Sequence, residues 1–172
     1  MKGLVFISLL IALSALALED FKHRTVRVFW FPIVLMLAIC YAVYEIGFNA
    51  LYMNTGVILL FLGVQTFFLL AYFIIKHRKW VDLTDQHIGW GDVLFLLVVV
   101  PLFSPFVYIL FYVFSLLCTI LFVLGYQLLR NRMTFIPLAG IQAVCLICLL
   151  CVHQLKHAFL FVNDVEFLMH TR

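Results

Sequence analysis

Long apolar runs, separated by short polar stretches, are the dominant pattern along this chain. Most of them approach the ~20 residues that a helix needs to cross the ~30 Å hydrocarbon core of a bilayer. In lipid each run must be a helix, because an open sheet edge would leave backbone groups without hydrogen-bond partners. The six runs cover residues 3–18, 28–44, 56–75, 88–103, 106–124 and 135–152.

The composition indicates that lipid is the main solvent of the chain. Of its 172 residues, 67% are hydrophobic and 11% are charged, and a soluble domain of this length could not bury so much apolar surface. We therefore expect an all-α, polytopic membrane bundle of six transmembrane helices that forms one domain over residues 1–172. Beyond residue 152, apolar residues recur at helical spacing, which predicts an interfacial amphipathic helix at the C-terminus.

Basic residues are concentrated in alternate loops. The loops after the first, third and fifth runs carry eight of the eleven lysines and arginines. Basic residues hold a loop in the cytoplasm, so we expect an N-terminus outside and a multi-pass protein of the cell (inner or plasma) membrane. The flanks of the first run favour a transmembrane helix over a cleaved signal peptide. The net charge of +3 follows from this distribution and does not indicate nucleic acid.

Several residues predict local features within this pattern. Residues 45–55 are short and nearly uncharged, and we expect an outer loop there. Gln65 and Thr66 are the central polar pair of the third run, where interhelical hydrogen bonding is the default role. Three cysteines follow a C-x-x-C-x-x-C spacing, but inside an apolar helix they are expected to be buried small hydrophobic residues. No metal site and no cofactor are predicted. The cysteines are Cys145, Cys148 and Cys151.

Two aspartates interrupt the apolar pattern at the same predicted depth. Asp20 ends the first helix, which enters the cytoplasm, and Asp92 begins the fourth, which leaves it. An acid at mid-helix in lipid costs about 3 kcal/mol, so Asp92 needs an explanation. Gly89 and Gly91 precede it in Gly89-Trp90-Gly91-Asp92, and their lack of a Cβ allows a peptide to approach closely.

The two acids are open to two interpretations. If the first and fourth helices are neighbours, the carboxyls can share one proton, as in aspartic proteases, where one acid deprotonates water and the other donates a proton. Alternatively, Glu19, Asp20 and Asp92 pair with nearby lysines and arginines. Within the first interpretation, the helix ends favour charge on Asp92 and the shared proton on Asp20.

With these residues the chain resembles the type IV prepilin peptidases, a family that includes the archaeal preflagellin peptidases. Asp20, followed by basic residues, matches the family's first catalytic acid, and Gly89, Gly91 and Asp92 match its G-x-G-D motif at the start of helix four. The resemblance implies a six-helix intramembrane aspartic endopeptidase that cleaves the leader peptide of pilin-like precursors at the cytoplasmic membrane face. Those precursors and membrane lipid would be its partners, and no metal is implied.

The chain also departs from the family pattern. Leu94 stands where many members have a lysine, and the late Pro-rich motif is matched only by Pro137. There is no cysteine-bearing cytoplasmic insertion, so the resemblance is to the small, peptidase-only members. The alternatives are a catalytically inactive family member and a non-enzymatic membrane scaffold or transporter whose acids handle protons or pair ions.

Overall fold

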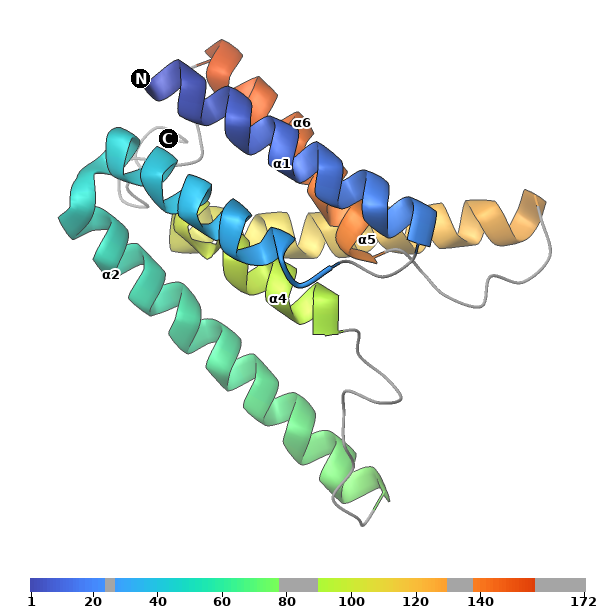
Figure 1. Cartoon of the computed structure of the whole chain (residues 1–172). Helices are drawn as coiled ribbons and strands as arrows, with labels where there is room; N and C mark the ends of the chain where they lie inside the picture. Colours follow the sequence, from blue (N-terminus) through green and yellow to red (C-terminus); the bar gives the residue numbers. More distant parts are fainter. Residues whose placement is uncertain (24–26, 78–89, 130–137, 157–172) are drawn as a thin grey trace, which may run out of the picture.

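The structure is a computed structural model of the whole chain, and it describes residues 1–23, 27–77, 90–129 and 138–156 (Figure 1). Within these ranges every regular element is a helix, which confirms the all-α prediction. The interfacial helix expected beyond residue 152 falls mostly on residues 157–172, outside the described part. The elements are α1 (Lys2–His23), α2 (Trp30–His77), α4 (Trp90–Val99), the 3₁₀ helix η1 (Val100–Leu102), α5 (Pro105–Leu129) and α6 (Leu138–Lys156).

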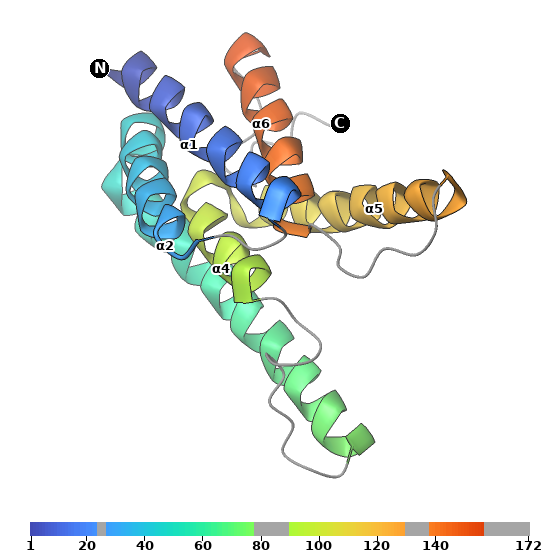
Figure 2. The same ribbon diagram turned by 45° about the vertical axis from the view of Figure 1, so that its right-hand side comes forward.

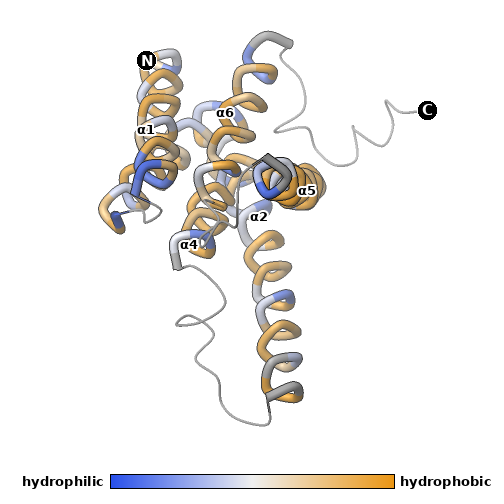
Figure 3. Tube along the Cα trace, turned by 90° about the vertical axis from the view of Figure 1, so that its right-hand side faces the viewer, coloured by the Kyte–Doolittle hydropathy of each residue, from blue (hydrophilic) through white to orange (hydrophobic). Residues whose placement is uncertain are grey.

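Three of the described helices are long and apolar enough to cross a membrane. These stretches are Lys2–His23 in α1, Trp30–Tyr72 in α2 and Pro105–Gln127 in α5, and two shorter apolar helices cover Gly91–Leu102 and Leu138–Gln154. Orange, the colour of hydrophobic residues, is the predominant colour of the helices in Figure 3. Large apolar side chains also point outward, and Ile75 is 78% exposed. Such a surface is typical of a membrane protein.

The chain reverses direction within α2, at Gly47. Residues 45–55 were expected to form a loop, but the helix continues through them, interrupted only where Gly47 has φ 76° and ψ 168°. A residue with a side chain is strained at this φ, so only glycine adopts it readily. The sequence prediction of an outer loop is therefore wrong, and a kink at one glycine makes the turn seen in Figure 1.

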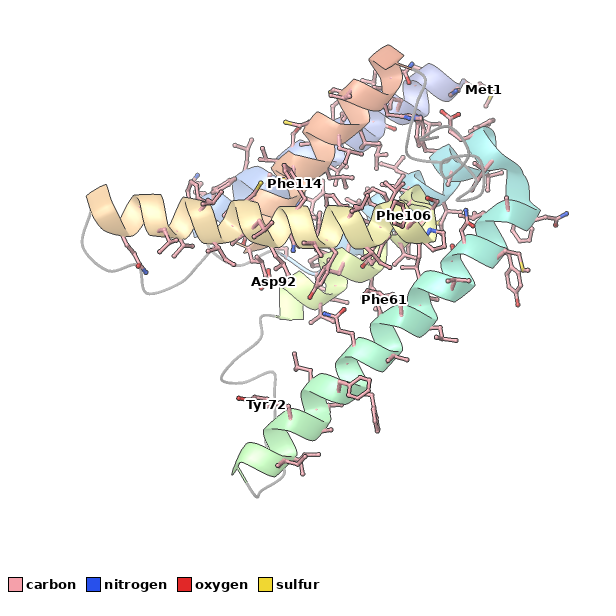
Figure 4. All side chains as sticks on the ribbon, turned by 180° about the vertical axis from the view of Figure 1, so that it is seen from behind. Met1, Phe61, Tyr72, Asp92, Phe106 and Phe114 are labelled. Atoms are coloured by element: carbon pink, nitrogen blue, oxygen red, sulfur yellow. The ribbon has the colours of Figure 1, made fainter. Side chains whose placement is uncertain are left out.

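The core lies where α1, the first half of α2, α4, η1 and α6 meet. Helix α1 packs against both α6 and α2, and α2 packs against η1 and α4. Aromatic rings hold the start of α5 against η1: Phe103 stacks on Phe111 with ring centroids 4.9 Å apart. The hydroxyl of Tyr108 donates a hydrogen bond to the carbonyl of Leu96 at 3.2 Å, which ties α5 to α4. Phe61 still packs against the core, and beyond it the second half of α2 extends away towards Tyr72, as Figure 4 shows.

The predictions for Gln65, Thr66 and the three cysteines are confirmed only in part. Gln65 makes the expected interhelical hydrogen bond, to the hydroxyl of Tyr112 on α5. Thr66 instead bonds to the carbonyl of Leu62 in its own helix, at 2.8 Å. The expectation that the cysteine run is buried is wrong for Cys148 and Cys151, which are exposed, because the spacing of three carries them round to the outer face of α6.

Candidate active site

Asp20 is buried at the end of α1 because it continues the helix stripe that packs into the core. Leu9, Leu13 and Leu16 are fully buried at spacings of four and three, and Asp20 follows four residues later at 6% exposure. Its Oδ2 atom accepts a hydrogen bond from the backbone N–H of Gly140 at 2.6 Å. The end of α1 meets the beginning of α6, as Figure 2 shows. A carboxylate at this position therefore has a strong, fixed donor.

Asp92 reaches the same point from a different helix. It lies in the first turn of α4 and is half-buried (Figure 4). Its Oδ1 atom accepts a hydrogen bond from the backbone N–H of Ala139 at 3.0 Å. Ala139 and Gly140 are consecutive residues, so the two carboxylates lie beside each other, separated by no more than two hydrogen bonds and one step of the helix backbone.

The two acids together occupy the N-terminal end of α6. The first N–H groups of a helix have no partner inside the helix, and here two of them donate to carboxylates from α1 and α4. This helix end carries partial positive charge, which favours negative charge on both Asp20 and Asp92. The prediction that Asp20 holds the shared proton was based on the ends of α1 and α4 alone. The N-terminal end of α6 is a third influence on the charge of both acids, and it was not part of that prediction.

Gly140 is the residue that allows this close approach. A Cβ atom built on it would lie 3.0 Å from Oδ2 of Asp20 and 3.3 Å from Cε2 of Phe21. Both separations are closer than an ordinary van der Waals contact, so a side chain here would require the carboxylate of Asp20 or the ring of Phe21 to move by a few tenths of an ångström. Gly140 was not among the site residues predicted from the sequence. A glycine so soon after Pro137, at the start of an apolar helix, was the available signal.

The structure describes only one of the two glycines of the G-x-G-D motif. Gly89 lies outside the described residues. Gly91 is described, and a Cβ atom built on it would lie 3.9 Å from Cζ of Phe31, an ordinary contact. Space for a methyl group is thus available at Gly91 in this structure. Leu94, two residues beyond Asp92, packs against the core of the protein.

Of the three acids Glu19, Asp20 and Asp92, one is paired with a basic residue among the described residues. Glu19 forms an ion pair with Arg27, with Nε of the arginine 3.1 Å from Oε1 of the glutamate. For Asp20 and Asp92, the hydrogen bonds found within the described residues come from backbone N–H groups of α6. Among the described residues, Glu19 is therefore an ion-pair partner, and both aspartates accept hydrogen bonds from the first turn of α6.

Gln142 is a second residue near this site that sequence reasoning missed. It lies on α6 one helical turn beyond Ala139 and is fully buried. Within the described part of the chain, neither its Nε2 nor its Oε1 atom has a hydrogen-bond partner. A buried amide without partners destabilises a protein, so its presence one helical turn beyond Ala139 needs a reason. The described residues contain no cluster of three or more His, Cys, Asp or Glu side chains that could hold a metal ion.

Compared with protein-family models, with curated proteins and with solved structures, the chain matches none of them.

Proposed function

We propose that this protein is an intramembrane aspartic endopeptidase of the prepilin-peptidase type. Its substrates would be pilin-like precursors, cleaved at the leader peptide on the cytoplasmic membrane face. The observation that supports this most is the convergence of Asp20 and Asp92 on the first turn of α6. Two acids from helices distant in sequence, side by side at the end of apolar helices, are the arrangement that proton-sharing hydrolysis requires.

In this proposal, one carboxyl group is charged and its neighbour is protonated. The charged group takes a proton from a water molecule, which attacks the carbonyl carbon of the scissile peptide bond. The protonated group donates its proton to the carbonyl oxygen, which gives a gem-diol intermediate. When this intermediate collapses, the proton taken from water passes to the leaving amine, and the other carboxylate recovers its proton from a hydroxyl of the gem-diol. No covalent intermediate with the protein forms. The N–H groups of Ala139 and Gly140 hold the two carboxylates in orientation, so this geometry is pre-organised before substrate binds.

The proposed topology gives the acids access to their substrate. Helix α1, the two halves of α2 on either side of Gly47, the α4–η1 segment, α5 and α6 would make six crossings, with the N-terminus outside. The distribution of basic residues supports this orientation. Both acids would then lie at the cytoplasmic interface, where a precursor can present the peptide bond ahead of its hydrophobic segment.

A second function is favoured by the same hydrogen bonds. Each carboxylate accepts from an N–H group that would otherwise lack a partner, so the acids could serve only to join α1 and α4 to α6. The protein would then be an inactive family member or a membrane scaffold. Leu94, in place of the family's lysine, is consistent with that function.

Paired substitutions at each acid separate the two functions. Asparagine keeps a side-chain oxygen that accepts from a helix N–H but cannot take or donate the catalytic proton, and alanine loses both roles. We expect Asp20→Asn and Asp92→Asn to abolish cleavage of pilin-like precursors from the same genome while preserving the melting temperature in detergent. Asp20→Ala and Asp92→Ala should abolish cleavage and also destabilise the protein by about 0.5–2 kcal/mol. Glu19→Gln is the matched control and should remain active. Wild-type turnover in either asparagine variant would exclude the peptidase.

A further inference from the structure

A shallow hollow lies at the end of α1, on a stripe of the helix next to the one that carries Asp20. Its volume is about 640 Å³. Four of the residues of α1 that line it recur at helical spacing (i, i+3, i+4, i+7), one residue or ~100° around the helix from the buried stripe. The other wall is formed by the segment that leads into α2 and by the start of that helix. The side chains used below are Ala15, Leu18, Glu19, Lys22, Arg27 and Trp30.

The hollow changes in chemistry along its length. Ala15 and Leu18 are apolar and lie towards the middle of α1, whereas Lys22 lies in its last turn. From Ala15 to Lys22 the helix rises roughly 10 Å, about a third of the hydrocarbon thickness. Trp30 adds an indole ring, a side chain that prefers the membrane interface. An apolar floor that ends in cations at the water side matches the shape of a phospholipid, with its acyl chain below and its phosphate above.

Glu19 organises the cationic end without neutralising it. Its Oε1 atom is engaged with Nε of Arg27, whose side chain is 83% exposed. That ion pair uses one edge of the guanidinium group, and the described residues contain no ion pair to its other nitrogens. Lys22 adds a second positive charge at the same rim. With two cations and one carboxylate, the rim favours an anionic group.

We propose that this hollow binds one phospholipid with an anionic headgroup, such as phosphatidylglycerol. Its phosphate lies between Lys22 and Arg27, and an acyl chain lies along Ala15 and Leu18. A free phosphate ion would leave the apolar floor uncovered, and a zwitterionic headgroup would bring its own cation to a cationic rim. The proposal does not depend on the protein being a peptidase.

Fluorescence quenching of Trp30 tests this proposal. The variant Trp80→Phe/Trp90→Phe leaves Trp30 as the single tryptophan, which lines the hollow. The protein is reconstituted into phosphatidylcholine vesicles that contain a small fraction of either brominated phosphatidylglycerol or brominated phosphatidylcholine. We expect the anionic lipid to associate roughly five- to thirtyfold more strongly, the range between the effect of one net positive charge at the rim and that of two basic residues near a headgroup. The substitutions Lys22→Gln and Arg27→Gln, combined, should abolish this preference.

Lys76→Gln provides the matched control, because it removes a basic residue at the distant end of α2. It should leave the preference unchanged. Equal quenching by the two lipids, or an equal loss of preference in Lys76→Gln, would show ordinary contact with bulk lipid and would overturn the proposal. Release of the quenching by millimolar inorganic phosphate would overturn it in favour of a site for free phosphate. Should the tryptophan substitutions disturb folding, native mass spectrometry of the wild-type protein with phosphatidylglycerol and phosphatidylcholine makes the same comparison.

Discussion

The carboxylate of Asp20 lies 2.6 Å from the backbone nitrogen of Gly140, a residue 120 positions further along the chain. This contact links the end of the first helix to the beginning of the last one. It is possible only because Gly140 has no side chain, since a Cβ atom would lie 3.0 Å from the same oxygen. The position of one acid of the proposed catalytic pair thus depends on the absence of a methyl group on another helix.

Gly140→Ala should reduce cleavage. The added methyl group requires the carboxylate of Asp20 or the ring of Phe21 to move by a few tenths of an ångström. A displacement of about 1 Å in a catalytic group can reduce the rate ~100-fold, so we expect this smaller shift to reduce it by less than that. We expect the loss in kcat, measured on a pilin-like precursor. Gly125→Ala, where the structure leaves the added Cβ in open space, is the control and should retain activity. Equal turnover in both variants would contradict the role of Gly140.

Gly91→Ala tests whether the glycine beside Asp92 serves the substrate. The nearest atom to an added Cβ is Cζ of Phe31 at 3.9 Å, so the substitution fits the structure without displacing a neighbour. We therefore expect an unchanged melting temperature and a raised KM for a precursor peptide, because the methyl group narrows the approach to the acid. An unchanged KM would mean that the substrate does not pass close to Gly91.

Gly47→Ala should destabilise the protein. The φ of 76° with ψ of 168° lies in a region that is almost restricted to glycine, and holding alanine there costs about 1–3 kcal/mol. Gly63→Ala is the matched control, since Gly63 is helical and a Cβ atom added there would have no neighbour within 4 Å. In thermal denaturation in detergent the control should be neutral or slightly stabilising. Equal melting temperatures in the two variants would contradict the reversal of α2 at Gly47.

Gln142→Leu should raise the melting temperature and lower the activity. Replacing a buried amide that has no partner with an apolar side chain of similar size removes a cost of ~1–3 kcal/mol. If the amide serves the reaction beside Asp92, cleavage should decrease although the fold is more stable. A lower melting temperature in Gln142→Leu would show instead that the side-chain amide of Gln142 has hydrogen-bond partners in the membrane.

The proposed orientation can be measured with reporter fusions. Fusions after Ile75 should report the cytoplasmic side, because the following loop carries Lys76, Arg78 and Lys79. Fusions after Val152 should report the outer side. A cytoplasmic signal from the second fusion would exclude the six-crossing topology and, with it, the expected common depth of the two acids.

The sequence predicted much of the helical framework because apolar composition alone forces helices in lipid. It also identified Asp20 and Asp92, since a carboxylate inside an apolar run stands out without any structural information. It predicted that the chain reverses between residues 45 and 55, but as a loop, because the residues around Gly47 are all compatible with either a loop or a helix. Only the backbone angles of that one glycine decide between the two.

The partners of the acids could not be predicted for a different reason. Ala139 and Gly140 take part through backbone N–H groups, which every residue except proline carries, so their side chains give no sign of the role. The packing of α1 against α6 decides which N–H groups meet which carboxylate. Gln142 was equally hidden, because a glutamine in an apolar run predicts burial without indicating what surrounds it.

The use of α6 to hold both acids also sets the order in which the site can be assembled. A membrane protein emerges from the ribosome N-terminus first, so α1 and α4 are synthesised before residues 139 and 140. Until α6 has inserted, Asp20 and Asp92 lack the backbone donors that fix them. A chain whose translation stops before residue 139 therefore carries both acids in the bilayer without the N–H groups that orient them.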